Sequence, residues 1–164
     1  MRKPGLLLAL LTTASLVSAC EPAGSACPAI AQATAVAVTV TAGYSPRAAT
    51  LHLRACQDGA CTEGGVELRP GSSSIDQGCS PEGACSATAS PDGTKVGTLM
   101  LAALTESPIT VTASGTSADG GALPVRTLEF RPKALYPFGE QCGKVLSAAV
   151  VLDDAGLHQQ PASR

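Results

Sequence analysis

Apolar and polar residues alternate with a period of two over much of this chain. The stretch 34–41 carries valine at every second position, with Ala or Thr between, so that Val36, Val38 and Val40 share one face. Successive side chains of a strand point to opposite sides, so this pattern predicts a half-buried β-strand. The same pattern places further residues on inward faces, namely Leu51, Leu53, Ala55, Val66, Leu68, Ile109, Val111 and Ala113.

Two stretches are more continuously apolar, at 95–104 and 144–154. Ala and Leu favour helix, but the flanking Gly and Pro and the β-branched neighbours favour buried strands, with Met100 in the core. A further strand is expected in LPVRTLEFRP, with Leu128 and Phe130 inward. Its alternation slips at residues 126–127, which predicts a bulge there.

Turn signals separate these strands at regular intervals. Asp-Gly occurs three times, at 58–59, 92–93 and 119–120, each between two strand-like runs. That dipeptide accepts the positive φ values of tight hairpins. Seven or eight short strands with such spacing predict an all-β fold, an antiparallel Ig-like β-sandwich over residues 32–155. The chain has no Trp, so the Ig core tryptophan is missing and only the architecture is inferred. Residues 156–164 are expected to form a flexible tail.

The N-terminus has the organisation of a targeting segment. Arg2 and Lys3 precede an apolar run from Gly5 to Val17, which is too short to cross a bilayer of about 30 Å. We interpret residues 1–19 as a cleaved signal. The following Val17-Ser18-Ala19-Cys20 resembles the lipobox of bacterial lipoproteins, which usually has Leu where this chain has Val17. The resemblance implies diacylglycerol attachment at Cys20, palmitate-type acyl chains, and a tether over residues 20–31.

The chain has seven cysteines, an odd number behind an apparent export signal. An odd cysteine is either a free or intermolecular thiol, or it is the acylated residue at position 20. Acylation leaves six cysteines for disulfides in an oxidising compartment. Spacing alone leaves 15 connectivities open. Short local staples are expected for Cys56 with Cys61 and for Cys79 with Cys85, which leaves Cys27 and Cys142 to close the domain. The alternative is zinc, but the Cys-x4-Cys and Cys-x5-Cys spacings and the lack of a nearby His disfavour it.

The mature chain also resembles small uncharacterised lipoproteins and secreted proteins of actinobacteria. The stretches that carry this resemblance are LRACQDGACTE, DQGCSPEGACSA, SPDGTKVG and YPFGEQCG. It implies a membrane-attached β-domain, and it carries over no activity and no site residues.

Composition argues against several functions. Removal of Arg2 and Lys3 leaves 9 basic against 13 acidic residues, which does not suit nucleic acid. Aromatic residues make up 2% of the chain, too few for a platform that stacks sugars or bases.

No catalytic, metal or cofactor site is expected. His52 alternates with leucines and should face solvent, whereas His158 should lie in a frayed tail. Asp153 and Asp154 are adjacent, so a strand sends them to opposite faces. Asp76 and Glu82 are the remaining alternative, as calcium ligands together with carbonyls of the 71–83 loop. An enzyme whose active site is formed by dispersed carboxylates is the third hypothesis.

Two surface features are left as candidate contacts. Residues 70–85 should form a protruding loop that the Cys79–Cys85 disulfide pre-orders, which lowers the entropy cost of binding. Tyr136 and Phe138 either cap one end of the sandwich or contact a partner protein.

The sequence therefore predicts a lipid-anchored, extracytoplasmic and non-enzymatic module at the cell membrane, with an interaction or envelope-structural role and an unidentified envelope partner. The alternative is a secreted or anchored inhibitor or small-ligand binder that uses the 70–85 loop.

Overall fold

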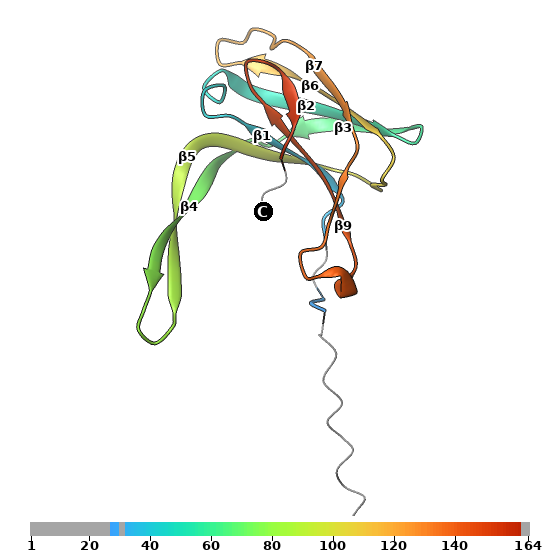
Figure 1. Cartoon of the computed structure of the whole chain (residues 1–164). Coiled ribbons are helices and arrows are strands. Elements are labelled where there is room, and N and C mark those ends of the chain that lie inside the picture. Colours follow the sequence, from blue (N-terminus) through green and yellow to red (C-terminus); the bar gives the residue numbers. More distant parts are fainter. Residues whose placement is uncertain (1–26, 30–31, 162–164) are drawn as a thin grey trace, which may run out of the picture.

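The computed structural model describes residues 27–29 and 32–161, and almost all of its regular structure is β (Figure 1). A single 3-10 helix, η1 (Glu140–Cys142), interrupts the strands of this part of the chain. The strands are β1 (Ala35–Val40), β2 (Ala48–Gln57), β3 (Ala60–Val66), β4 (Arg69–Cys79), β5 (Cys85–Met100), β6 (Ile109–Ser117), β7 (Arg126–Phe130), β8 (Lys133–Leu135), β9 (Val145–Leu152) and β10 (Leu157–Gln159).

The strands form two sheets, and the predicted all-β sandwich is confirmed. The first sheet has the order β10-β9-β1-β5-β4, with β8 also paired to β9, and the second has the order β3-β2-β6-β7. Hairpins alternate between the sheets along the chain: β2–β3 and β6–β7 belong to the second sheet, and β4–β5 and β8–β9 to the first. One pair departs from the prediction, because β1 and β9 are parallel. The strand number exceeds the expected seven or eight, since β8 and β10 are short strands of three residues each.

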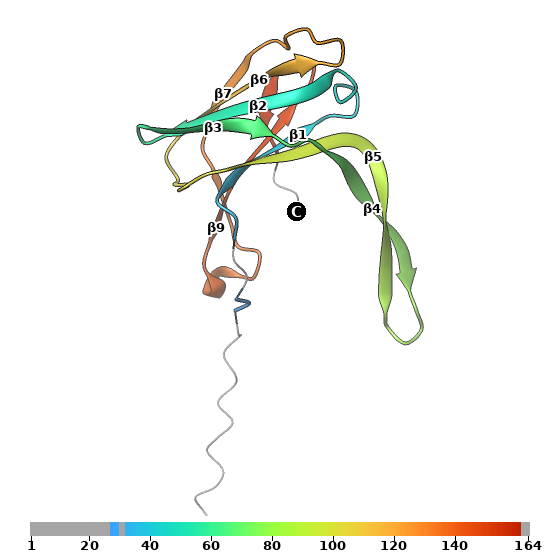
Figure 2. The same ribbon diagram turned by 180° about the vertical axis from the view of Figure 1, so that it is seen from behind.

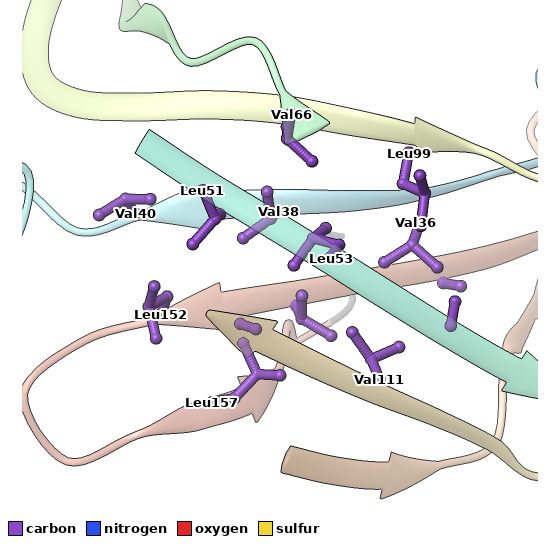
Figure 3. Packing of buried hydrophobic residues seen from close by; sticks show 14 of the residues in the cluster. Val36, Val38, Val40, Leu51, Leu53, Val66, Leu99, Val111, Leu152 and Leu157 are labelled. Carbon is purple, nitrogen blue, oxygen red and sulfur yellow. The ribbon is translucent and has the colours of Figure 1, made fainter. Parts of the chain in front are cut away.

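The core lies between the sheets and consists of the inward half of each alternating strand (Figure 3). Val36, Val38 and Val40 of β1 are almost completely buried, and so is Leu53 of β2. The predicted inward faces of β1, β2 and β6 are therefore confirmed. The buried set from the other strands comprises Val66, Leu99, Phe130, Ala148, Val150, Leu152 and Leu157.

Two of the three Asp-Gly turns are confirmed and the third is not a turn. Asp58–Gly59 joins β2 to β3 with φ of 51° and 80°, and Gly120, with φ of 85°, lies in the turn after β6. Asp92–Gly93 instead lies inside the 16-residue strand β5. A dipeptide that tolerates positive φ can form a β-bulge as well as a hairpin turn, and Asp92–Gly93 lies at a bulge within β5.

Several local predictions are wrong. Met100 is 59% exposed at the end of β5, and the strand stops there instead of continuing to residue 104. The bulge expected at 126–127 is absent, because β7 keeps continuous register with β6, whereas β2 has an irregularity between Ala48 and Thr50. The predicted flexible tail contains β10, which pairs with β9 and buries Leu157.

All three expected disulfides are formed. Cys56–Cys61 and Cys79–Cys85 close short segments, and Cys27–Cys142 spans 115 residues. The long-range bond joins the segment before β1 to η1, in the connection between β8 and β9. Both views show that this connection and the far end of the β4–β5 hairpin project from the same side of the sandwich, away from the sheet β3-β2-β6-β7 (Figures 1 and 2).

Candidate interaction surfaces

The most prominent surface feature is the far half of the β4–β5 hairpin, residues 72–91, which we call the arm. The near half of β5, residues 95–100, pairs with β1, but residues 85–91 pair only with β4. The arm is therefore a two-stranded ribbon that leaves the sandwich (Figure 1). Its residues 72–89 are all exposed, so it has no core of its own.

The arm begins at a bulge in β5. Pro70 pairs with Lys95 and Ser72 pairs with Pro91, so Asp92, Gly93 and Thr94 oppose one residue of β4. Gly93 has φ of 77°, and a strand with such extra residues bends. We call residues 92–94 together with Gly71 the elbow.

Hydrogen bonds and close packing fix the elbow. The Thr94 amide and hydroxyl both donate to Asp92 Oδ1, at 3.0 and 2.7 Å. The hydroxyl bond, followed by the amide bond, lowers the pKa of Asp92 below its usual value. Opposite them, a Cβ at Gly71 would overlap Thr94 Oγ1 and lie 3.1 Å from Asp92 Oδ1. The elbow therefore needs glycine at position 71.

The tip of the arm is a closed turn. The Ser80 amide donates to the Ala84 carbonyl at 2.7 Å, the Gly83 amide donates to the Ser80 carbonyl at 2.9 Å, and the Cys79–Cys85 disulfide joins the strand ends. The Gly78 amide donates to Asp76 Oδ1 at 2.7 Å. The expected protrusion is thus present, but the 70–85 segment is not a loop. Residues up to Cys79 belong to strand β4, including the Gly-Ser run at 71–74.

The arm surface is polar, small and acidic. Between Arg69 and Lys95 the chain carries Asp76, Glu82 and Asp92 and no basic residue. Ile75 is the large apolar side chain of the arm and is 48% exposed. The outer edges of both arm strands have no strand beside them in the described part of the chain. Such edges offer unpaired N–H and C=O groups to another extended chain.

The second feature is an apolar turn, residues 135–138, which we call the aromatic tip. Leu135, Tyr136 and Phe138 are 38%, 47% and 37% exposed and lie outside the core cluster. The expectation that Tyr136 and Phe138 cap the sandwich is therefore wrong. Contact with a partner was the alternative and stays a proposal.

The aromatic tip is held in a compact turn. The Gly139 amide donates to the Tyr136 carbonyl at 3.1 Å, and the Cys142 amide donates to the Gly139 carbonyl at 3.1 Å. Gln141 Nε2 donates to the Phe138 carbonyl at 3.0 Å. The Cys27–Cys142 disulfide then fixes this turn to the segment that precedes β1.

The histidines occupy different settings. His52 is exposed on the outer face of β2, as expected. His158 does not lie in a frayed tail but on β10, with its Nε2 3.2 Å from Asp153 Oδ1. The same oxygen accepts hydrogen bonds from the Gly156 and Ala155 amides, and these bonds, that of Gly156 first, lower the pKa of Asp153 below its usual value. Asp153 therefore closes the β9–β10 turn, and sequence spacing gave no signal for its contact with His158.

A depression lined by both polar and apolar residues lies beside the β6–β7 connection and was not foreseen. Its lining includes Tyr44, Arg47, Asp119, Arg126 and Asp154. Arg47 forms an ion pair with Asp154 and lies 4.4 Å over the Tyr44 ring. Arg126 Nε is buried without a hydrogen-bond partner, although its Nη2 lies 3.5 Å from the Asp154 carbonyl.

The described residues were also compared with the requirements of a metal site and of a membrane-spanning helix. Across residues 27–29 and 32–161, no three His, Cys, Asp or Glu side chains gather as metal ligands. In the same part of the chain, no helix has the length and apolarity needed to cross a membrane.

The predicted lipidation site, Cys20, the signal 1–19 and most of the tether lie outside the described residues. Comparison with protein-family models, curated proteins and solved structures yields no match for this chain.

Proposed function

We propose that this protein is a lipid-anchored, extracytoplasmic interaction module that presents the arm to a partner protein at the membrane surface. The observation that carries the proposal is a disulfide-closed ribbon that leaves the sandwich and exposes its residues 72–89. An isolated two-stranded hairpin is at best marginally stable in water. In the arm, the Cys79–Cys85 disulfide closes the tip and the Asp92–Thr94 hydrogen bonds fix the elbow. The ribbon is therefore ordered before it binds, which lowers the entropy cost of binding.

The anchor part of the proposal is supported by the sequence and by the disulfides. The VSAC motif at residues 17–20 has the pattern at which bacterial lipoproteins are acylated, behind a short apolar segment. Three disulfides suit an oxidising compartment outside the cytoplasm. Two or three acyl chains on one residue give a stable anchor, whereas a single chain is marginal.

The partner is inferred from the chemistry of the arm. Natural sheet edges are commonly protected by Lys, Pro or an inward charge, but Ser86–Ser90 has none of these. A partner strand could add to this edge through main-chain hydrogen bonds. The acidic side chains Asp76 and Glu82 would favour a partner segment with Lys or Arg beside that strand.

The anchor is tested by intact-mass measurement of protein from the membrane fraction, beside a Cys20→Ala variant. We expect an acyl mass in the wild type and its loss in the variant. Wild-type protein that is found free in the medium at unmodified mass would refute the anchor.

The arm is tested by photo-cross-linking in cells, with the reactive amino acid placed at Thr88 on the arm or at His52 on the outer face of β2. Both positions are exposed, so His52 is the matched control. We expect a discrete product from position 88 that is missing from position 52. Equal labelling from both positions would contradict a role for the arm.

A further inference from the structure

The four aromatic residues of the chain divide into two groups. Tyr44 and Phe130 are buried in the sandwich, at 5% and 8% exposure. Tyr136 and Phe138 are exposed, two residues apart, beside the exposed Leu135. Half of the aromatic side chains of the protein therefore gather at one apolar turn, and that turn projects from the sandwich (Figure 2). Apolar side chains that are exposed together in this way make the turn a candidate contact surface.

The position of this turn is set covalently. Cys142 lies four residues after Phe138, within the same hydrogen-bonded turn, and its disulfide holds Cys27. Cys27 lies only seven positions after Cys20, with six residues between them. A fully extended chain spans at most about 3.3–3.6 Å per residue, so Cys27 stays within about 25 Å of Cys20.

From this limit on the distance between Cys27 and Cys20, we infer that the aromatic tip, residues 135–138, inserts its apolar side chains into the headgroup region of the membrane that holds Cys20. The inference rests on the proposed lipid anchor. The headgroup region adds about 5–8 Å to each side of the hydrocarbon core. This thickness is well below the limit of about 25 Å between Cys27 and Cys20. Tyr is enriched at this depth because its ring is apolar and its hydroxyl is polar.

The charges near the tip favour contact through apolar groups. Lys144 forms an ion pair with Glu106. Lys133, two residues before the tip, donates to the Gln160 carbonyl, and Glu140 is exposed beside the turn, so two lysines are matched by two glutamates. No excess of positive charge is left to attract anionic lipids, so the contact should not depend on them. The arm projects from the same side of the sandwich but is acidic and polar, so it suits the aqueous layer above the headgroups.

The test uses the absence of tryptophan from the chain, which makes one introduced indole a unique probe. The acylated full-length protein with Phe138→Trp is reconstituted into phosphatidylcholine vesicles. The matched control is Val125→Trp, at a side chain that is 66% exposed in the connection between β6 and β7. We expect emission from position 138 to shift to shorter wavelength on reconstitution and to be quenched by lipids brominated near the headgroup. Emission from position 125 should not change.

Two further measurements separate the possible outcomes. Leu135→Ser with Tyr136→Ser, made in the Phe138→Trp background, should reduce the shift, and adding phosphatidylglycerol should leave it unchanged. Intact mass of the same samples reports acylation. If the acyl mass is present and position 138 emits as in water, the aromatic-tip inference is overturned while the anchor stands. A shift that appears only when envelope proteins are added assigns the tip to a partner protein and also overturns it. An unmodified N-terminus overturns the anchor, and the inference with it.

Discussion

The two projecting hairpins of the larger sheet differ in almost every respect. The arm is long, acidic and free of aromatic residues, and a local disulfide closes its tip. The β8–β9 hairpin is short and apolar at its turn, and its disulfide reaches back 115 residues to Cys27. A local bond stiffens the element that contains it. A long-range bond fixes the position of its element relative to the start of the chain.

This difference suggests a division of roles on one side of the sandwich. The hairpin tied to the N-terminal segment has the side chains that a membrane interface accepts, Tyr136 and Phe138. The arm carries polar side chains and unpaired strand edges, which suit a protein partner in water. The proposed anchor would then orient the arm as well as retain the protein.

Removing the long-range disulfide should have the largest effect on stability. By the chain-entropy model, a closed loop of this length contributes about 4–5 kcal/mol. We expect Cys27→Ser with Cys142→Ser to lower the free energy of unfolding by roughly that amount, measured by urea titration.

The matched control is Cys79→Ser with Cys85→Ser, for which the same model gives about 2 kcal/mol at most. Because this bond restrains the arm alone, its loss should mainly speed hydrogen exchange and proteolysis within residues 72–91, while the urea midpoint of the sandwich changes little. Equal loss of global stability in both variants would contradict the division of roles.

The near and far halves of the β4–β5 hairpin should respond differently to truncation. Leu99 lies on β5 where the strand joins the core and is 7% exposed, whereas Ile75 on the arm is 48% exposed. We expect Leu99→Ala to cost about 2–5 kcal/mol and Ile75→Ala to stay within about 0.5 kcal/mol. Urea titration of both variants checks this. A large loss from Ile75→Ala would show that the arm packs against the domain.

Sequence patterning was sufficient for the sandwich but not for the arm. Val36, Val38 and Val40 alternate because one face of β1 is buried, and that asymmetry is visible in the sequence. Residues 72–89 are exposed on both faces, so no apolar period marks them as strands. The parallel pairing of β1 with β9 joins segments more than 100 residues apart, which no local pattern encodes.

The candidate surfaces could also be predicted only in part from local sequence patterns. The Cys79–Cys85 spacing predicted a rigid protrusion, but Asp92–Gly93 gave the same signal as the true turn at Asp58–Gly59. What distinguishes the elbow is Gly71 on the opposite strand, a contact that only the three-dimensional structure reveals. Tyr136 and Phe138 were found as candidates because ALYPFG gathers Pro and aromatic residues close to Cys142, yet their exposure could not be derived from the sequence.

The elbow should be sensitive to added volume. We expect Gly71→Ala to destabilise the arm by about 1–3 kcal/mol, because the new methyl group would overlap the Thr94 hydroxyl. Gly65→Ala on β3 is the matched control, since a Cβ there meets no atom within 4 Å. Hydrogen exchange of arm amides, compared with those of β1, measures the effect. Protection of the arm that equals the wild type in Gly71→Ala would show that the elbow is loosely packed.

The smallest expected effect is an acid-dependent loosening of the elbow. The Thr94 hydroxyl and amide bonds lower the pKa of Asp92 in the folded protein. A carboxylate with a lowered folded pKa stabilises the fold above its unfolded pKa of about 3.9, and this contribution is lost as the pH falls through the folded value. NMR titration of the Asp92 carboxyl, followed together with the arm amides, measures both events.

Thr94→Val isolates the cause of this acid dependence. The variant removes the hydroxyl and keeps the backbone amide, so the pKa of Asp92 should rise toward its usual value and the arm should loosen at a higher pH. Thr88→Val on the exposed arm changes the same functional group without touching Asp92, and it should leave the titration unchanged. If Asp92 in the wild type titrates at its ordinary pKa, the hydroxyl bond does not hold the elbow, and packing around Gly71 alone sets the direction of the arm.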